Sequence, residues 1–283
     1  MSALSIILTA TEEVAYLRET AEAALSSVAA LRIDTELIIT SPAAMEKTVR
    51  KEMRGLPCRV CPSATTAPAA LSNHGAALAS GEVFLFLQEG VILTAEGLQK
   101  LLETLLLHEE IAAVGPFSNH TQFSWQYLKD EEMRASGEDP TAWVSRHLTS
   151  PSESLFLEHV ALLVRRSAFQ QVHGFDEAFA GGGADLDLSF RLKYEGFHLL
   201  RASAYFVHRG AGSCDLYDLT RSEARPPLLQ RWGIDIGVPE TILQETLGGI
   251  VWTKNMPLIH ASGRSALLRT PLVSIMIPTY NRP

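Results

Sequence analysis

The sequence has few positive charges and no long apolar run. Its 283 residues include 24 Lys and Arg against 32 Asp and Glu, and no Lys/Arg cluster is present. Proteins that bind nucleic-acid polymers normally carry a basic patch, so this class of partner is not expected. No stretch approaches the roughly 18–20 apolar residues that a transmembrane helix needs. The opening MSALSIILTATEE has no basic lead-in, so we expect no signal peptide.

Cysteine is also scarce, with three residues in the chain. Such low usage is typical of a reducing compartment, and we expect a cytoplasmic location. Cys58 and Cys61 form a single C-x-x-C, which without a second pair indicates two partly buried thiols rather than a zinc or redox site. No G-x-G-x-x-G follows the first apolar run, which disfavours a dinucleotide-binding enzyme.

Strand and helix patterns alternate over the first 115 residues. Apolar, β-branched runs at 4–8, 36–40, 59–61, 82–87 and 111–114 predict strands, with helical spacing between them. Ser41 and Pro42 are expected to cap and begin the second helix. The alternation predicts an α/β fold with a doubly wound, mostly parallel sheet. Such sheets bind ligands beyond the carboxyl ends of their strands, where we expect the site.

The two ends of the sequence resemble each other. Residues 4–9 are LSIILT and residues 273–278 are VSIMIP, each an apolar strand followed by a turn. We therefore expect that a second copy of the domain begins near the end of the chain. The expected organisation is a domain at 1–213, a helical extension or linker at 214–270, and the truncated first strand of a second domain at 271–283.

Several motifs occur in a characteristic order. They are SNHGAALASGEVFLFL at 72–87, VGPFSN at 114–119, GFDEAF at 174–179, DLDLSFRL at 185–192, His208, and VSIMIPTYNRP at 273–283. Residues 3–213 resemble a diverged family 2 glycosyltransferase of the GT-A fold, and the last motif resembles the opening of that family. The resemblance implies an inverting enzyme that moves a sugar from a nucleotide-diphosphate sugar to an acceptor hydroxyl, in the assembly of glycans or glycoconjugates.

The resemblance assigns the catalytic base to Asp185. The family uses the second acid of a pair at the start of a helix, and here the first position of that pair is Ala184. A base is needed because the acceptor hydroxyl must lose its proton. The alternative is that Asp185 only caps the helix. Asp187 is a candidate acceptor-binding residue or a further cap of the same turn.

The donor side departs from the family pattern. Where the family has Asp-x-Asp, whose carboxylates hold a divalent cation on the diphosphate, this sequence has Gln88-Glu89-Gly90. Glu89 and His208 are the candidate ligands for Mn²⁺ or Mg²⁺. The alternative, which the residues favour, is a solvated Glu89 and a His208 that only ends a strand. Positive charge for a metal-independent diphosphate site could come from Arg165, Arg166, Arg191 or Arg209.

Other candidate binding residues follow from the same resemblance. Those expected to bind the nucleotide sugar are Thr9, Ala10, Glu12, Ser41, Asn73, Gln88 and Glu89. Those expected to bind the acceptor are Ser118, Asn119, Trp125 and Asp187, with Phe123 and Tyr127 on the same loop. Aromatic side chains suit a sugar or peptide surface, but they can equally pack the loop onto the protein.

Two functions are therefore open. The first is a working glycosyltransferase acting on a carbohydrate or protein acceptor, with Asp185 as base. The second is a catalytically silent domain that serves as a structural or acceptor-binding module beside an active second glycosyltransferase domain. Binding of a nucleotide sugar separates the two, because a silent module has no need of a donor.

Overall fold

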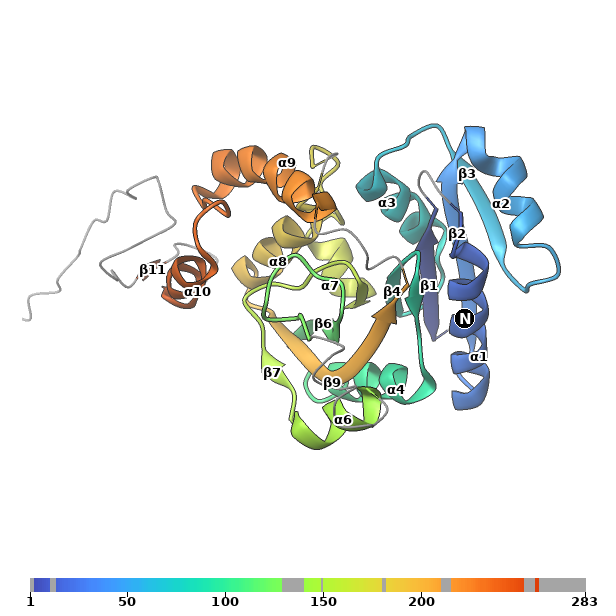
Figure 1. The fold of residues 1–283 in the computed structure, drawn as a ribbon, viewed down its shortest axis with the longest axis horizontal. Coiled ribbons are helices and arrows are strands. Elements are labelled where there is room, and N and C mark those ends of the chain that lie inside the picture. Colours follow the sequence, from blue (N-terminus) through green and yellow to red (C-terminus); the bar gives the residue numbers. More distant parts are fainter. Residues whose placement is uncertain are drawn as a thin grey trace, which may run out of the picture.

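The computed structural model describes residues 3–10, 14–128, 140–148, 150–179, 182–209, 215–251 and 258–259 (Figure 1). The strands are β1 (Leu4–Thr9), β2 (Thr35–Pro42), β3 (Arg59–Ser63), β4 (Val83–Gln88), β5 (Val91–Ile92), β6 (Ile111–Ser118), β7 (Ser152–Glu153), β8 (Ala161–Arg165), β9 (His198–His208), β10 (Ile250–Val251) and β11 (Leu258–Ile259). The helices are α1 (Leu17–Leu31), α2 (Glu46–Glu52), α3 (Pro68–Leu78), α4 (Ala95–Leu105), α6 (Pro140–His147), α7 (Arg166–Gln171), α8 (Ala184–Tyr194), α9 (Asp215–Trp232) and α10 (Glu240–Gly248), with a 3₁₀ turn at Ala43–Met45.

One mixed sheet organises the described part of the chain, in the order β3-β2-β1-β4-β8-β6-β9-β5. Strands β1 to β4 are mutually parallel, and β8 lies antiparallel between β4 and β6. The parallel pair β6 and β9 completes the main body. The predicted α/β class with a mostly parallel sheet is confirmed. The carboxyl ends of these parallel strands lie at one edge of the sheet. Ligands of such sheets bind at this edge, so the candidate site is described there.

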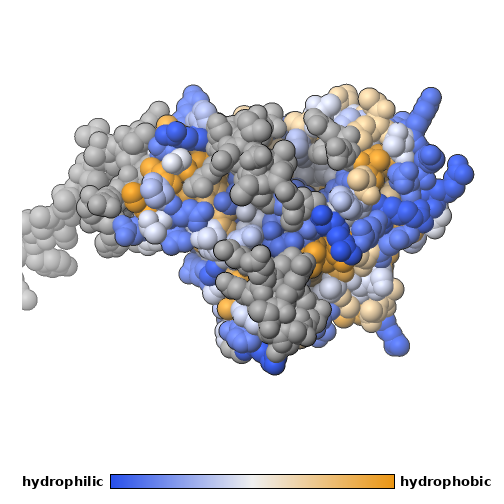
Figure 2. Space-filling model, viewed as in Figure 1, coloured by the Kyte–Doolittle hydropathy of each residue, from blue (hydrophilic) through white to orange (hydrophobic). Residues whose placement is uncertain are grey.

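Helices cover both faces of the sheet. On one face, alternate residues of β1, namely Leu4, Ile6 and Leu8, are buried in a cluster with residues of α1, α2 and α4. On the other face, Ile7 is buried in a cluster with residues of α3, α7 and α8 (Figure 1). Burial on both faces explains why β1 and β4 read as continuous apolar runs. Figure 2 shows hydrophilic side chains along the outer edge where α2, with sequence EKTVRKE, lies.

The expected start of the second helix is wrong. Ser41 and Pro42 are the last residues of β2 and pair in register with Pro62 and Ser63 of β3. The helical region begins one residue later, in the 3₁₀ turn at Ala43–Met45. Pairing with a neighbouring strand therefore overrides a local Ser-Pro capping signal, because propensity is weaker than a sheet ladder.

Helices α9 and α10 belong to a third apolar cluster. Phe190 of α8, Leu228 of α9 and Leu243 of α10 are all buried in it, together with aromatic residues of the loop that follows β6. Side chains of α9 and α10 are thus packed against α8. No helix in the described part is both long enough and apolar enough to cross a membrane.

Gly75 of α3 permits the close contact of this helix with β1. A Cβ added at Gly75 would lie 2.5 Å from Cγ2 of the fully buried Ile7 and 3.2 Å from Cγ2 of Thr40. We expect Gly75→Ala to destabilise the protein by about 1–3 kcal/mol, because overpacking outweighs the gain in helix propensity. Gly248→Ala is the matched control, since nothing lies within 4 Å of its Cβ. Thermal unfolding measures both, and an unchanged or raised melting temperature for Gly75→Ala would contradict the expectation.

Candidate active site

Small hydroxyl side chains line the carboxyl ends of β1 and β2. Oγ1 of Thr9 lies 3.3 Å from Oγ1 of Thr40 and 3.4 Å from Oγ of Ser72. The Oγ of Ser41 is buried and has no hydrogen-bond partner in the described part of the chain. The backbone N–H of Ala10 continues the ladder by donating to the carbonyl of Thr40 at 2.8 Å. Of the other predicted donor-site residues, Glu12 lies outside the described residues.

The end of β4 adjoins the end of β9. Gln88 is exposed, and Oε1 of Glu89 accepts the backbone N–H of Tyr16 at 3.0 Å. The carbonyl of Gly90 accepts the N–H of Arg209 at 2.9 Å, and a Cβ at Gly90 would lie 2.9 Å from Cε1 of His208. The structure therefore brings the Glu89-Gly90 turn and His208 side by side, although Gly90 and His208 are 118 positions apart in the sequence.

These residues fit a divalent cation poorly. The His208 ring stacks on His120 with centroids 4.1 Å apart. Burial lowers the pKa of both rings to about 4, so both are neutral at pH 7. A hard cation prefers several oxygen ligands, and the turn supplies one carboxylate, which already accepts a backbone N–H. Among the described residues, no three His, Cys, Asp or Glu side chains converge to hold a metal ion.

Of the four arginines proposed for the diphosphate, three are engaged elsewhere. Arg165 donates to the carbonyls of Leu105, His108 and Ile111. Arg166 donates to the carbonyl of Ser80 at 3.0 Å.

Arg191 donates to Oδ2 of Asp187 at 2.7 Å and to the carbonyl of Gly174 at the same distance. Arg209 differs from these three because it follows β9 beside the Gly90 turn. Its side chain is 54% exposed and pairs with Glu19 at 3.1 Å. Arg209 is therefore the member of the set that lies at the carboxyl edge with its charge accessible.

Asn73 holds the GFDEAF turn in place. Its Nδ2 donates to the carbonyl of Phe175 at 2.8 Å and to Oε1 of Glu177 at 3.0 Å, and its Oδ1 accepts the N–H of Phe175 at 2.9 Å. A single amide thus ties α3 to a turn about a hundred residues later. These contacts explain the paired motifs at 72–75 and 174–177 without a ligand, so donor binding by Asn73 stays a prediction.

Asp185 is the second residue of α8, and the helix cap is Gly183 with a φ of 81°. The alternative that Asp185 is the N-cap is therefore wrong. Its Oδ2 accepts the N–H of His159 at 2.8 Å and its Oδ1 accepts the N–H of Leu186 at 2.9 Å. Burial raises the pKa of Asp185 above its ordinary value, while the backbone N–H groups oppose the shift. A partly buried carboxylate with a raised pKa is suited to accept a proton.

Asp187 has a different environment from Asp185. It is fully buried, its Oδ2 accepts from Nε of Arg191 at 2.7 Å, and its Oδ1 accepts from Nε1 of Trp232 at 2.9 Å. Nε of Arg231 lies 3.4 Å from the same Oδ1. The carboxylate thus joins α8 to α9 inside the protein, and binding of the acceptor substrate by Asp187 stays a prediction.

The loop after β6 is packed down onto the protein. The Phe123 and Trp125 rings stack 4.8 Å apart, and Phe156 contacts both edge-on. Phe123 is 1% exposed and Trp125 is 8% exposed, so of the two alternatives for these aromatics the structure favours packing. Tyr127 remains 38% exposed.

Ser118 and Asn119 shape the start of this loop. Oδ1 of Asn119 accepts the N–H of His208 at 2.8 Å, and its Nδ2 lies 3.3 Å from the carbonyl of the same residue. The buried Oγ of Ser118 accepts the N–H of His120 at 3.3 Å. Acceptor binding by either residue stays a prediction, since the described contacts are all within the protein.

Sequence reasoning missed Glu158. It is 4% exposed, and its carboxylate accepts the N–H groups of Gln122 and Phe123 at 2.5 and 3.0 Å. Burial raises the pKa of Glu158 well above its ordinary value. A signal was present, because a single acid interrupts the apolar run LFLEHVALLV at 155–164. An acid rarely sits inside such a run without a polar partner.

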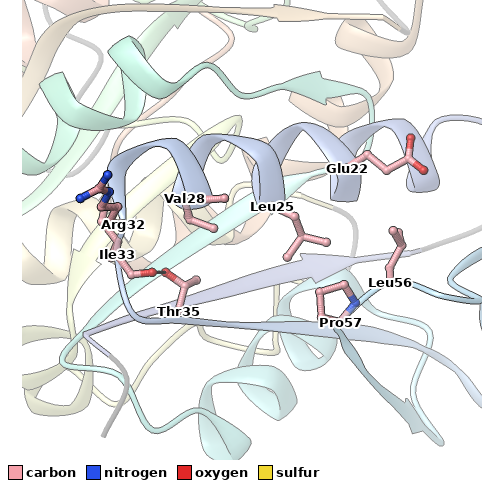
Figure 3. A pocket seen from close by; sticks show the side chains of 9 residues that line it. Glu22, Leu25, Val28, Arg32, Ile33, Thr35, Leu56 and Pro57 are labelled. Atoms are coloured by element: carbon pink, nitrogen blue, oxygen red, sulfur yellow. Dashed lines mark hydrogen bonds between the residues drawn. The ribbon is translucent and has the colours of Figure 1, made fainter.

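A separate groove of about 480 Å³ lies between α1 and the start of β2 (Figure 3). Leu25, Val28 and Leu56 contribute apolar surface, and Glu22 and Arg32 lie toward its two ends. The groove adjoins the first residue of β2, whereas the site described above adjoins the last residues of that strand. It is therefore distinct from the carboxyl edge.

Comparison with known proteins agrees with this geometry. The model of the "Glycosyltransferase like family 2" matches residues 4–208. The mannosyltransferase PcManGT from Pyrobaculum calidifontis, solved in complex with GDP-Man and Mn²⁺, has a TM-score of 0.59 at 12% identity, over 81% of this chain and 62% of that one. This chain thus spans less than two thirds of that protein.

Two further solved structures share the fold. Glucosyl-3-phosphoglycerate synthase from Mycobacterium tuberculosis, in complex with Mn²⁺ and UDP-glucose, has a TM-score of 0.54 at 16% identity, over 84% of this chain and 82% of that one. S. aureus TarS 1-349 has a TM-score of 0.52 at 13% identity, over 86% and 68%. No curated protein sequence matches the chain. With the family matched over most of its length and the GT-A fold shared, the chain belongs to the glycosyltransferase-like family 2.

Proposed function

We propose that this chain transfers a sugar from a nucleotide-diphosphate sugar to an acceptor hydroxyl, with inversion of configuration. Asp185 takes the acceptor proton as the acceptor oxygen attacks the anomeric carbon. The nucleoside diphosphate leaves from the opposite face. The position of Asp185 carries this proposal. Its partly buried carboxylate lies at the start of α8 and accepts the N–H of His159. The next residue, Val160, accepts the N–H of Gln88 at the end of β4, so Asp185 lies close to the proposed donor site.

The donor would lie across the carboxyl ends of β1, β2 and β4. Hydroxyls of Thr9 and Ser41 line this edge. The Oγ of Ser41 has no hydrogen-bond partner among the described residues and is suited to bind the nucleobase or the ribose of the donor. Arg209 supplies the positive charge that a leaving diphosphate requires. The structurally similar mannosyltransferase and glucosyl-3-phosphoglycerate synthase were solved in complex with Mn²⁺. The residues present at the Gln88-Glu89-Gly90 turn of this chain fit such a cation poorly.

Titration calorimetry with UDP, GDP, UDP-glucose and GDP-mannose, each with and without Mn²⁺, tests the proposal. We expect one nucleotide series to bind without Mn²⁺. Arg209→Ala should weaken this binding about tenfold to a hundredfold, because charge-assisted hydrogen bonds contribute about 1.5–3 kcal/mol. Arg50→Ala is the matched control, since Arg50 is equally exposed but pairs with Glu46 on α2. Binding that requires Mn²⁺ would assign the diphosphate to a metal instead of Arg209.

The second candidate function is a catalytically silent module beside an active second glycosyltransferase domain. The favouring observation is the Gln88-Glu89-Gly90 turn, in which Glu89 is bonded to the backbone of Tyr16. The segment 271–283, on which the second domain was predicted, lies outside the described residues. If none of the four nucleotide ligands binds under either condition, the silent module replaces the enzyme as the proposal.

A further inference from the structure

Glu158 holds the loop that follows β6 at three points. Its Oε2 accepts the N–H of Gln122 at 2.5 Å, and its Oε1 accepts the N–H of Phe123 at 3.0 Å. Its own N–H donates to Oε1 of Gln126 at 2.8 Å. Gln126 in turn donates from Nε2 to the carbonyl of Pro116 at 2.9 Å, so the loop is tied back to β6.

The next residue along the chain holds the proposed base. The N–H of His159 donates to Oδ2 of Asp185 at 2.8 Å. This N–H belongs to the peptide unit that joins residues 158 and 159, and a peptide unit is planar and stiff. A displacement of Glu158 therefore changes the direction of the hydrogen bond to Asp185. The loop that follows β6 and the carboxylate of Asp185 are therefore linked through the peptide unit of residues 158 and 159.

Two further carboxyl groups face Glu158, namely Asp185 from α8 and Glu240 from α10. Burial is the main cause that raises the pKa of Glu158, both carboxylates add to it, and the N–H groups of Gln122 and Phe123 oppose it. Burial also raises the pKa of Asp185.

We propose that Glu158 is a positioning residue for the transfer step, which fixes the 119–127 loop with its carboxyl group and orients the carboxylate of Asp185 through the peptide N–H of His159. The inference rests on the proposed function for the identity of the reaction. The linkage itself depends only on the contacts above. The proposal gives a role to a buried acid that lies outside the sequence motifs described above.

Amide hydrogen exchange, resolved by NMR on the whole chain, tests the linkage without any substrate. In Glu158→Ala we expect the amides of Gln122, Phe123 and His159 to exchange about tenfold faster or more, which corresponds to a loss of about 1.4 kcal/mol or more of local protection. Glu158→Gln keeps the side-chain volume but offers one acceptor oxygen, so it should release one of the two loop amides. Glu240→Gln is the matched control, because Glu240 accepts the N–H of Ser124 at 3.1 Å and should affect that amide alone.

Each outcome decides the proposal. Unchanged exchange of the Gln122 and Phe123 amides in Glu158→Ala would show that Glu158 does not hold the loop. Faster exchange there with an unchanged His159 amide would reduce Glu158 to a loop anchor with no link to the base. Should Glu158→Ala fail to fold, the Gln variant gives the same comparison at one loop amide and at His159.

Turnover adds a readout that separates this inference from the proposed function. With UDP-glucose or GDP-mannose as the donor, Glu158→Ala should lower kcat and leave the donor KM unchanged. If the unaltered protein turns over neither donor, the proposed function fails for these donors, while amide exchange still decides the linkage. Turnover with a kcat unchanged in Glu158→Ala would overturn the positioning role alone.

Discussion

Asp185→Asn should lower the rate of sugar transfer by roughly 10²–10⁴-fold, the range that general base catalysis contributes. The amide cannot accept the acceptor proton, whereas it still occupies the same volume beneath the N–H of His159. Initial rates of nucleoside diphosphate release, with a donor found by calorimetry, measure the effect. Donor affinity should stay within about twofold, because the proposed donor contacts lie at the ends of β1, β2 and β4.

The control for this variant is Asp34→Asn, an exposed aspartate before β2 that should leave the rate unchanged. The pH dependence gives a second check. Because burial raises the pKa of Asp185, the rate should rise with pH through a value above the ordinary one for aspartate, and level off once the carboxylate is ionised. A variant that retains most of its rate, or a profile without this rise, would exclude Asp185 as the base.

The raised pKa of Asp185 also has a consequence for folding. The folded protein binds a proton here over a pH interval in which the unfolded chain has released it. Stability therefore falls as the pH rises from the ordinary aspartate pKa to the raised one. Ionising the proposed base therefore costs some of the stability of the fold, which is typical of catalytic groups.

Asp187→Ala should destabilise the protein by about 3–5 kcal/mol, the usual cost of removing one partner of a buried ion pair. Arg191, with 14% of its side chain exposed, would lose its carboxylate, and Nε1 of Trp232 would lose its acceptor. For a chain of this size the melting temperature should fall by about 10 °C. Thermal and urea unfolding measure the change.

Glu46→Ala is the matched control for Asp187→Ala. It breaks the pair between Arg50 and Glu46 on α2, whose side chains are 55% and 38% exposed, and such pairs contribute about 0–1 kcal/mol. The stability of Asp187→Asn should lie between those of Asp187→Ala and Glu46→Ala, because the amide keeps an oxygen that can accept from Nε1 of Trp232. If Asp187→Ala were as stable as Glu46→Ala, the buried contacts of Asp187 would not stabilise the packing of α8 on α9.

Much of the fold was predictable from local patterns. Apolar runs identified β1 and β4, because strands buried on both faces cannot alternate in polarity. Local sequence also specifies a helix start at Thr94, a residue type that favours the cap position, and its hydroxyl accepts the N–H of Gly97. The order of the motifs placed Asp185 at the start of a helix. Each of these features depends on residues that are neighbours in the sequence.

What the sequence determined was therefore the family, the fold class and the position of the proposed base. Tertiary structure alone decided that Asp187 is internal, that Phe123 and Trp125 pack the loop down, and that Arg209 rather than Arg165 lies at the carboxyl edge. It alone joined Glu158 to a loop 36 residues earlier and to the base. Local periodicity encodes which face of an element is buried, but not which distant group its polar atoms meet, because that pairing exists only once the chain has folded.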